Sequence, residues 1–294
     1  NFPLLAVPFF MVVGQLMNET GISRRLVDFS DALVGHLRGG LAHVNVVVSM
    51  IFAGISGVSS ADTSGVGSVL IPAQLKAGYP AGFTVGVPAA SSTLGNIIPP
   101  SLMMIIYAAT AGLSVGGLFL TGIVPGVLIG LLQMGYSFFV AYKLGIGREH
   151  KFSFRRLWSQ SKIAVLALFI PVVVVGGIIL GVFTATEASC ITVLYALFLA
   201  VIYREASLRK VYETFKTSIG LFSLSLFCVA AASLWGWVLA YYNIPETVVG
   251  YMDAWGMLSS KTLIFLTVII IFLVVGTFMD AIPAIIILQR IIGS

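Results

Sequence analysis

Charged residues are scarce in this sequence. They make up 9% of its 294 residues, whereas hydrophobic residues make up 59%. A soluble domain usually contains about 25% charged residues. The composition therefore predicts a polytopic membrane protein and argues against a soluble enzyme or a protein that binds nucleic acid. The net charge of +5 fits Lys and Arg residues collected in cytoplasmic loops.

Residues that serve as nucleophiles or transition-metal ligands are also few. The chain has two cysteines, Cys190 and Cys228, and three histidines. Both cysteines lie in apolar runs, where cysteine acts as a small hydrophobic residue more often than as a disulfide or metal ligand. No nucleophile–histidine pair occurs within an apolar run. We therefore do not expect an enzyme, either soluble or intramembrane.

What the sequence has in abundance is apolar runs of the length that a membrane helix needs, about 20 residues. Several runs are interrupted by Gly, Pro or Ser. The runs cover residues 2–17, 42–72, 83–111, 116–142, 163–183, 190–203, 219–241 and 258–292. The predicted fold class is an all-α polytopic membrane protein with several broken helices.

The charged loops between these runs predict how the chain crosses the membrane. Loops 21–40, 143–162 and 204–216 are rich in Lys and Arg and should be cytoplasmic, whereas 242–256 has only acidic charges and should face outward. Two cytoplasmic loops must be separated by an even number of crossings, but three apolar runs lie between residues 40 and 143. Parity is restored if 42–72 is a re-entrant hairpin whose tip is the stretch "GISGVSSAD".

The order of segments repeats later in the chain. A crossing run, an amphipathic arm at 22–37 and the first hairpin are matched by a second crossing run, an arm at 245–255 and a break at "GTFMDAIPA", with the direction reversed. Inverted repeats with discontinuous helices are typical of secondary transporters. We predict two re-entrant hairpins, and we expect two further spans beyond each end of the repeat, as if the chain were cut from a longer protein.

The repeat divides the chain into four predicted parts. Residues 1–41 form a scaffold helix and arm, and 42–143 form a transport core with the first hairpin and a broken helix. Residues 144–257 form a cytoplasmic loop, scaffold helices and the second arm, and 258–294 form the second hairpin.

A second interrupted run, "PAASSTLGNIIPPSLMMIIYA", indicates an ion site. Pro99 and Pro100 lack N–H groups, so carbonyls one turn earlier lose their helical partners. Freed carbonyls together with hydroxyl and amide oxygens suit a hard cation such as Na⁺, and helix N-termini after each break suit an anion. The predicted sodium ligands are Gly54, Ser56, Ser60, Asn96, Pro99, Gly276 and Asp280. The predicted substrate ligands are Ser59, Asp62, Ser91, Ser92 and Thr93.

Plainer roles stand beside these. Intramembrane acids such as Asp62 and Asp280 are functional candidates, but each is also placed to cap the helix that follows it. The serines and threonines are equally suited to hydrogen bonds between helices. Glu187, in "TATEAS", either caps a helix or contacts a partner protein.

The interrupted stretches closely resemble the large membrane subunit of tripartite ATP-independent periplasmic (TRAP) transporters. The similar motifs are "GLAHVNV", "AGISGVSSADTSGVGSVLIPA", "GYPAGFTVGVPAASSTLGNIIPPSLMMIIYA", "GVFTATEAS" and "GTFMDAIPAIIIL". The sequence departs from the family at Val58, where another Ser is common, and at Arg290, where a Pro is expected. The resemblance covers residues 2 to about 288.

The resemblance implies sodium-driven uptake of an organic acid anion, such as a C4-dicarboxylate, sialic acid or another acid sugar, by an elevator mechanism in the bacterial inner membrane. It implies two protein partners, a periplasmic substrate-binding protein and a small membrane subunit of four helices, besides the surrounding membrane lipid. Two rivals remain: a channel, which usually shows pore-lining rings, and a stand-alone sodium/organic anion symporter that needs no binding protein.

Overall fold

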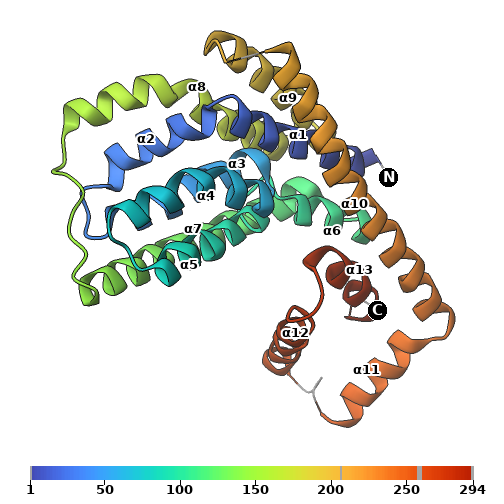
Figure 1. Ribbon diagram of the computed structural model, residues 1–294. Coiled ribbons are helices and arrows are strands. Elements are labelled where there is room, and N and C mark those ends of the chain that lie inside the picture. Colours follow the sequence, from blue (N-terminus) through green and yellow to red (C-terminus); the bar gives the residue numbers. More distant parts are fainter. Residues whose placement is uncertain (1, 206, 257–259, 293–294) are drawn as a thin grey trace. The chain divides into compact units, whose positions relative to one another are not determined.

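The computed structural model describes residues 2–205, 207–256 and 260–292, without the side chains of residues 2 and 290–292. All the regular secondary-structure elements in this part of the chain are helices (Figure 1). The early ones are η1 (Phe2–Leu5), α1 (Ala6–Glu19), α2 (Ile22–Val34), α3 (Gly40–Ser56), α4 (Ser59–Lys76), α5 (Ala81–Ser91), η2 (Ser92–Asn96), α6 (Leu102–Ala111) and α7 (Val115–Lys143). The later ones are α8 (Phe154–Ile179), α9 (Ala185–Ile202), α10 (Leu208–Tyr241), α11 (Ile244–Ala254), α12 (Lys261–Val275) and α13 (Ala281–Ile292).

The chain packs as two compact units. The first contains Asn1–Ala109 and Leu113–Ile219, and the second contains Thr110–Gly112 and Gly220–Ser294. This division follows packing and leaves the four predicted functional parts untested. In the second unit, α13 packs against both α11 and α12. The side chain of Arg290, where the sequence departs from the family, lies outside the described part.

The predicted first hairpin is present. Helices α3 and α4 lie antiparallel, and the chain reverses between them at Gly57 and Val58. Gly57 has a φ of 62°, in the left-handed region that only glycine adopts without strain. A second helical pair, α12 and α13, meets at residues 276–280, where the sequence analysis placed the second break.

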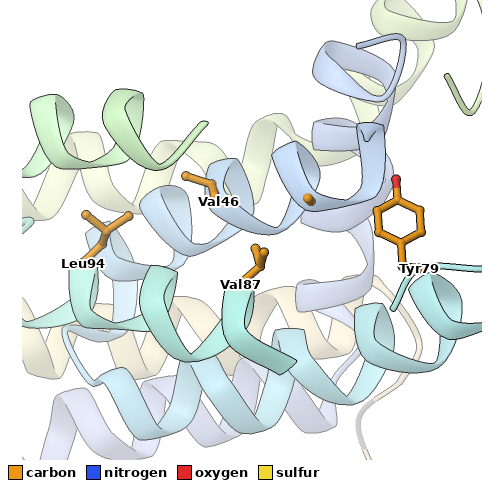
Figure 2. Packing of buried hydrophobic residues seen from close by; sticks show 5 residues of the cluster. Val46, Tyr79, Val87 and Leu94 are labelled. Atoms are coloured by element: carbon orange, nitrogen blue, oxygen red, sulfur yellow. The ribbon is translucent and has the colours of Figure 1, made fainter. Parts of the chain in front are cut away.

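A core of apolar side chains joins the hairpin to the helices that follow it. Val46 on α3 faces Val87 on α5 and Leu94 on η2 (Figure 2), and all three are buried. Figure 1 shows α3, α4, α5 and α7 running side by side. The hairpin is therefore held on one side by α5 and η2 and does not stand free.

Four helices in the described residues are long and apolar enough to cross a membrane: α7, α8, α9 and α10. Large apolar side chains are exposed along α7, for example Leu128 and Leu132, as expected of surfaces that contact lipid. The arm α2 follows α1 at an angle of 72°. The interrupted run after α5 is broken as predicted, with no regular helix between Asn96 and Leu102.

Two predicted boundaries were wrong. Helix α8 begins at Phe154, although the apolar run predicted there begins at residue 163. Helix α10 begins at Leu208, although its apolar run begins at residue 219. In both cases the helix continues into segments with several Lys and Arg residues, which the sequence analysis read as loops. Hydropathy marks only the part of a helix inside the bilayer, because basic residues favour helices almost as well as leucine does.

The segment between α7 and α8, residues 144–153, is hydrogen-bonded to residues of three other segments of the first unit. The N–H of Gly39 donates to the carbonyl of Gly147 at 2.9 Å. The hydroxyl of Tyr79 donates to Glu149 Oε1 at 3.0 Å, and His150 Nε2 lies 3.2 Å from Asp31 Oδ2. Burial and the Glu149 carboxylate raise the pKa of Tyr79, so its phenol remains protonated as the donor.

Candidate functional site

The two breaks in the first unit are packed directly against each other. The N–H of Leu102, the first residue of α6, donates to the carbonyl of Gly57 at 3.2 Å. A Cβ on Gly57 would lie 2.1 Å from the carbonyl oxygen of Pro100. The hairpin tip can approach the double proline this closely because Gly57 has no side chain.

The start of α4 is also packed closely against η2. A Cβ on Gly95 would lie 3.1 Å from the backbone nitrogen of Ser59 and 3.3 Å from its Cα. On the opposite side, the first helix approaches the same tip, because a Cβ on Gly14 would lie 3.0 Å from the Cβ atoms of both Ser56 and Ala61. Because the residues at these positions are small, the backbones of α1, the hairpin tip and η2 can pack closely together.

The predicted sodium ligands of the first tip fall into two groups. Gly54, Ser56 and Pro99 are buried, and the carbonyl oxygen of Pro99 lies 3.7 Å from the position of a Cβ on Gly54. The Ser56 hydroxyl donates to the carbonyl of Phe52 at 3.3 Å and accepts the N–H of Val58 at 3.4 Å. Asn96 is half-buried, and Ser60 is exposed on α4.

Loss of helical bonding at the double proline is partly compensated. The hydroxyl of Ser101 donates to the carbonyl of Asn96 at 2.7 Å and accepts the N–H of Met104 at 3.3 Å. Together with the bond from Leu102 to Gly57, this satisfies part of the N-terminus of α6. The oxygen lining predicted from freed carbonyls therefore includes fewer free groups than the prolines alone imply.

Comparison with known proteins identifies the family of this chain. The family described as "Tripartite ATP-independent periplasmic transporter, DctM component" matches residues 1–294. The chain belongs to this family. It is therefore a large TRAP permease subunit, a multi-pass membrane transporter and not an enzyme.

Individual relatives carry different substrate names. The chain is 36% identical over 293 residues to the 2,3-diketo-L-gulonate TRAP transporter large permease protein of Escherichia coli, covering 99% of the chain and 68% of that protein. It is 37% identical over 290 residues to the sialic acid TRAP transporter large permease protein of Vibrio cholerae, covering 98% and 67%. It is 37% identical over 292 residues to the C4-dicarboxylate TRAP transporter large permease protein of Pseudomonas aeruginosa, covering 99% and 68%.

The predicted substrate ligands of the permease differ in exposure. Thr93 is exposed and Ser59 is half-buried, whereas Asp62 and Ser91 are 1% and 0% exposed. Ser92 is 5% exposed, and its hydroxyl donates to the carbonyl of Ala89 at 3.2 Å. These roles stay predictions, and burial argues against direct substrate contact for Asp62 and Ser91.

The capping roles left open by the sequence are resolved for Glu187 and Asp62. Glu187 completes a capping box with Thr184 at the start of α9. At the start of α4, the N-cap position is occupied by Val58, and no side chain caps the helix by a hydrogen bond. Asp62 is therefore not a cap.

The second predicted site of the permease lies in the other unit. Gly276 and Asp280 are both exposed, and the carbonyl of Asp280 accepts the N–H of Ala284 at 3.2 Å. Their role as sodium ligands stays a prediction.

Three polar residues around the first hairpin were missed by the sequence analysis. Asn18 on α1 donates to the carbonyl of Ala61 at 3.0 Å, and Asn45 and Ser49 on α3 both contact Ser91. The signal for the last two was present in "VNVVVS", where the two polar residues stand four positions apart in an apolar run and so share a helix face. Asn18 has no comparable sequence signal.

Proposed function

We propose that the full-length protein takes up an organic acid anion across the bacterial inner membrane by sodium-coupled secondary transport. The relatives are named for 2,3-diketo-L-gulonate, sialic acid and C4-dicarboxylate, which are carboxylates, and another is named for the sulfonate isethionate. For this chain, we propose a substrate of the same class: a C4-dicarboxylate, sialic acid or another acid sugar.

The observation that carries this proposal is the packing of one helix break on another. Non-helical backbone at membrane depth is tolerated where it is buried in protein or lines a polar cavity. Here the tip at Gly57 packs against the break at Pro100. Gly54, Ser56 and Pro99 line this junction and supply oxygen atoms to it. We place the first sodium ion there, with Asn96 and Ser60 as its remaining predicted ligands.

A second sodium ion is proposed at the corresponding break of the second hairpin, held by Gly276 and Asp280. Inverted repeats usually carry related sites. The substrate anion is proposed to contact Ser59, Ser92 and Thr93, near the N-terminus of α4. Because Lys76 is the only Lys or Arg between residues 41 and 142, we expect hydroxyl groups and helix N–H groups to supply the contacts.

Partners are proposed from the family. A small four-helix membrane subunit completes the scaffold, and a periplasmic substrate-binding protein delivers the anion. One relative, the isethionate TRAP transporter permease protein of Oleidesulfovibrio alaskensis, is named DctMQ, and this chain covers 46% of it at 35% identity. In the proposed elevator mechanism, the core with both hairpins slides against the scaffold, and the exposed apolar faces of α7, α8 and α10 contact lipid or the small subunit.

Reconstitution tests the proposal. The full-length permease and its small subunit are placed in liposomes, and uptake of labelled organic acids is measured with and without an inward Na⁺ gradient and the binding protein. We expect uptake to require both. Uptake that needs Na⁺ but no binding protein supports the stand-alone symporter instead, and uptake that is indifferent to Na⁺ contradicts sodium coupling.

Removal of one predicted ligand should weaken sodium dependence. In the Ser56→Ala permease, we expect the Na⁺ concentration for half-maximal uptake to rise about tenfold, which corresponds to about 1.4 kcal/mol of lost binding energy. Ser64→Ala is the matched control, because Ser64 is an exposed serine of the same hairpin whose hydroxyl donates to the carbonyl of Ala61. Identical sodium titrations for both variants would rule out Ser56 as a ligand.

A further inference from the structure

Two arginines from different segments of the first unit are held side by side. Arg38, just before α3, and Arg148, just after α7, are joined by an isolated antiparallel bridge. Next to them, the N–H of Gly39 donates to the carbonyl of Gly147 at 2.9 Å, so the two arginines face each other as a pair without hydrogen bonds of its own. The side chains of such residues project to the same face, with Cβ atoms about 4.5–5.5 Å apart. We call these two residues the arginine pair.

The arginine pair has no acidic partner among the described residues. Both side chains are exposed, and the ion pairs in the described part of the chain include neither of them. Two acids of neighbouring segments are bound elsewhere, because Asp31 contacts Arg156 and Glu149 accepts the hydroxyl of Tyr79. Like charges directly opposite each other are destabilising, so the pair favours the binding of an anion between its two guanidinium groups.

The arginine pair lies where α7 leaves the membrane. Cζ of Arg38 lies 5.2 Å from the centre of the Tyr142 ring, and Tyr142 is in the last turn of this long apolar helix. Tyr142 is 63% exposed, and Phe139, one turn earlier, is 62% exposed. Because tyrosine is enriched at the level of the lipid headgroups, the two guanidinium groups lie at the depth of phosphates, next to an exposed apolar surface.

We propose that the arginine pair binds the phosphate of an anionic phospholipid, whose acyl chains lie along the exposed face of α7 near Phe139. Arginine binds phosphate through two parallel hydrogen bonds, and basic clusters at the cytoplasmic ends of membrane helices recognise anionic headgroups. Residues 143–156 contain five Lys or Arg residues and one acid, so the surroundings also attract negative charge. The adjoining apolar surface favours a lipid over a soluble phosphate. This site is independent of the proposed sodium coupling and of the substrate.

Native mass spectrometry of the purified full-length permease and its small subunit, titrated with phosphatidylglycerol or phosphatidylcholine, tests the site without transport. We expect the wild type to hold one phosphatidylglycerol more tightly than any phosphatidylcholine. In the double variant Arg38→Gln, Arg148→Gln, this lipid should bind about thirtyfold more weakly, because each basic residue near a membrane surface contributes about fivefold to anionic lipid binding.

The matched control is the double variant Lys151→Gln, Arg155→Gln. It loses the same two charges, and both residues are exposed in the same basic segment, but neither belongs to the arginine pair. We expect its affinity for phosphatidylglycerol to stay within about threefold of the wild type. If the variant of the arginine pair does not assemble, Arg148→Gln alone provides the test, with about fivefold weaker binding expected.

The position of the lipid is checked with phosphatidylglycerol that carries a photoreactive acyl chain, which should cross-link to α7 close to Phe139. Equal weakening by the two double variants would overturn the site, because overall charge alone would then explain binding. Absence of a tightly held phosphatidylglycerol in the complex with the small subunit would overturn it as well, as when that subunit covers the pair. Displacement of the lipid by equimolar inorganic phosphate would assign the pair to a soluble anion and overturn the lipid assignment.

Discussion

Replacing Gly57 by alanine is expected to abolish substrate uptake. Two costs add at this position. The φ of 62° is unfavourable for alanine by roughly 1–2 kcal/mol, and the new methyl group would lie 2.1 Å from the carbonyl oxygen of Pro100. A backbone carbonyl in the broken helix cannot rotate away as a side chain can, so the tip must withdraw from the break, which would disrupt the sodium site proposed there.

Gly78→Ala is the matched control for this variant. Gly78 ends the same hairpin with a φ of 83°, and no atom lies within 4 Å of its added Cβ, so it carries the conformational cost without the clash. We expect uptake by Gly78→Ala to remain within about threefold of the wild type at equal membrane abundance, which is less than 1 kcal/mol. Equal uptake by the two variants would show that the contact between Gly57 and Pro100 is dispensable.

A disulfide between α1 and α4 is expected to stop transport reversibly. A Cβ on Gly14 would lie 3.0 Å from the Cβ of Ala61, so cysteines at these positions need a shift of about 0.5 Å to reach disulfide geometry. The first helix belongs to the proposed scaffold and the hairpin to the proposed core. If the core slides, a Gly14→Cys, Ala61→Cys permease should lose uptake on oxidation and regain it with a reductant.

The background for this experiment lacks Cys190 and Cys228, the native cysteines, which are both unpaired. Each single cysteine variant, treated with the same oxidant, controls for the substitution itself. Cross-linking is scored by the shifted mass of a protease fragment before uptake is compared. Complete cross-linking with undiminished uptake would show that α1 and the hairpin move as one body.

Much of the hairpin could be predicted from sequence because its signals are local. The sequence analysis placed the hairpin tip within residues 54–62 and the helix break at Pro99 and Pro100, and both follow from the backbone chemistry of glycine and proline. The need for a re-entrant hairpin followed from charge parity. These arguments use neighbouring residues or the distribution of charged residues along the chain, and neither requires knowledge of tertiary contacts.

The composition of the site was harder to predict because burial depends on partners distant in sequence. Asp62 and Ser60 are two residues apart, yet one is 1% exposed and the other faces outward. The difference arises from the packing of neighbouring helices, among them α3 and α5, against α4. The same holds for Asn18, whose partner carbonyl is 43 positions away. Helix ends at Phe154 and Leu208 were missed because basic residues hide them from a hydropathy criterion.

The hydrogen bonds of segment 144–153 bear on how far α7 can move relative to α8 if the core slides as proposed. The ten residues of this segment would span about 35 Å if fully extended, more than enough for large displacements of α7 relative to α8. In the structure, hydrogen bonds at Gly147, Glu149 and His150 hold the segment against other parts of the first unit. If α7 moves as part of a sliding core, the distance it can travel therefore depends on how many of these hydrogen bonds break, and the covalent length of the segment sets the outer limit.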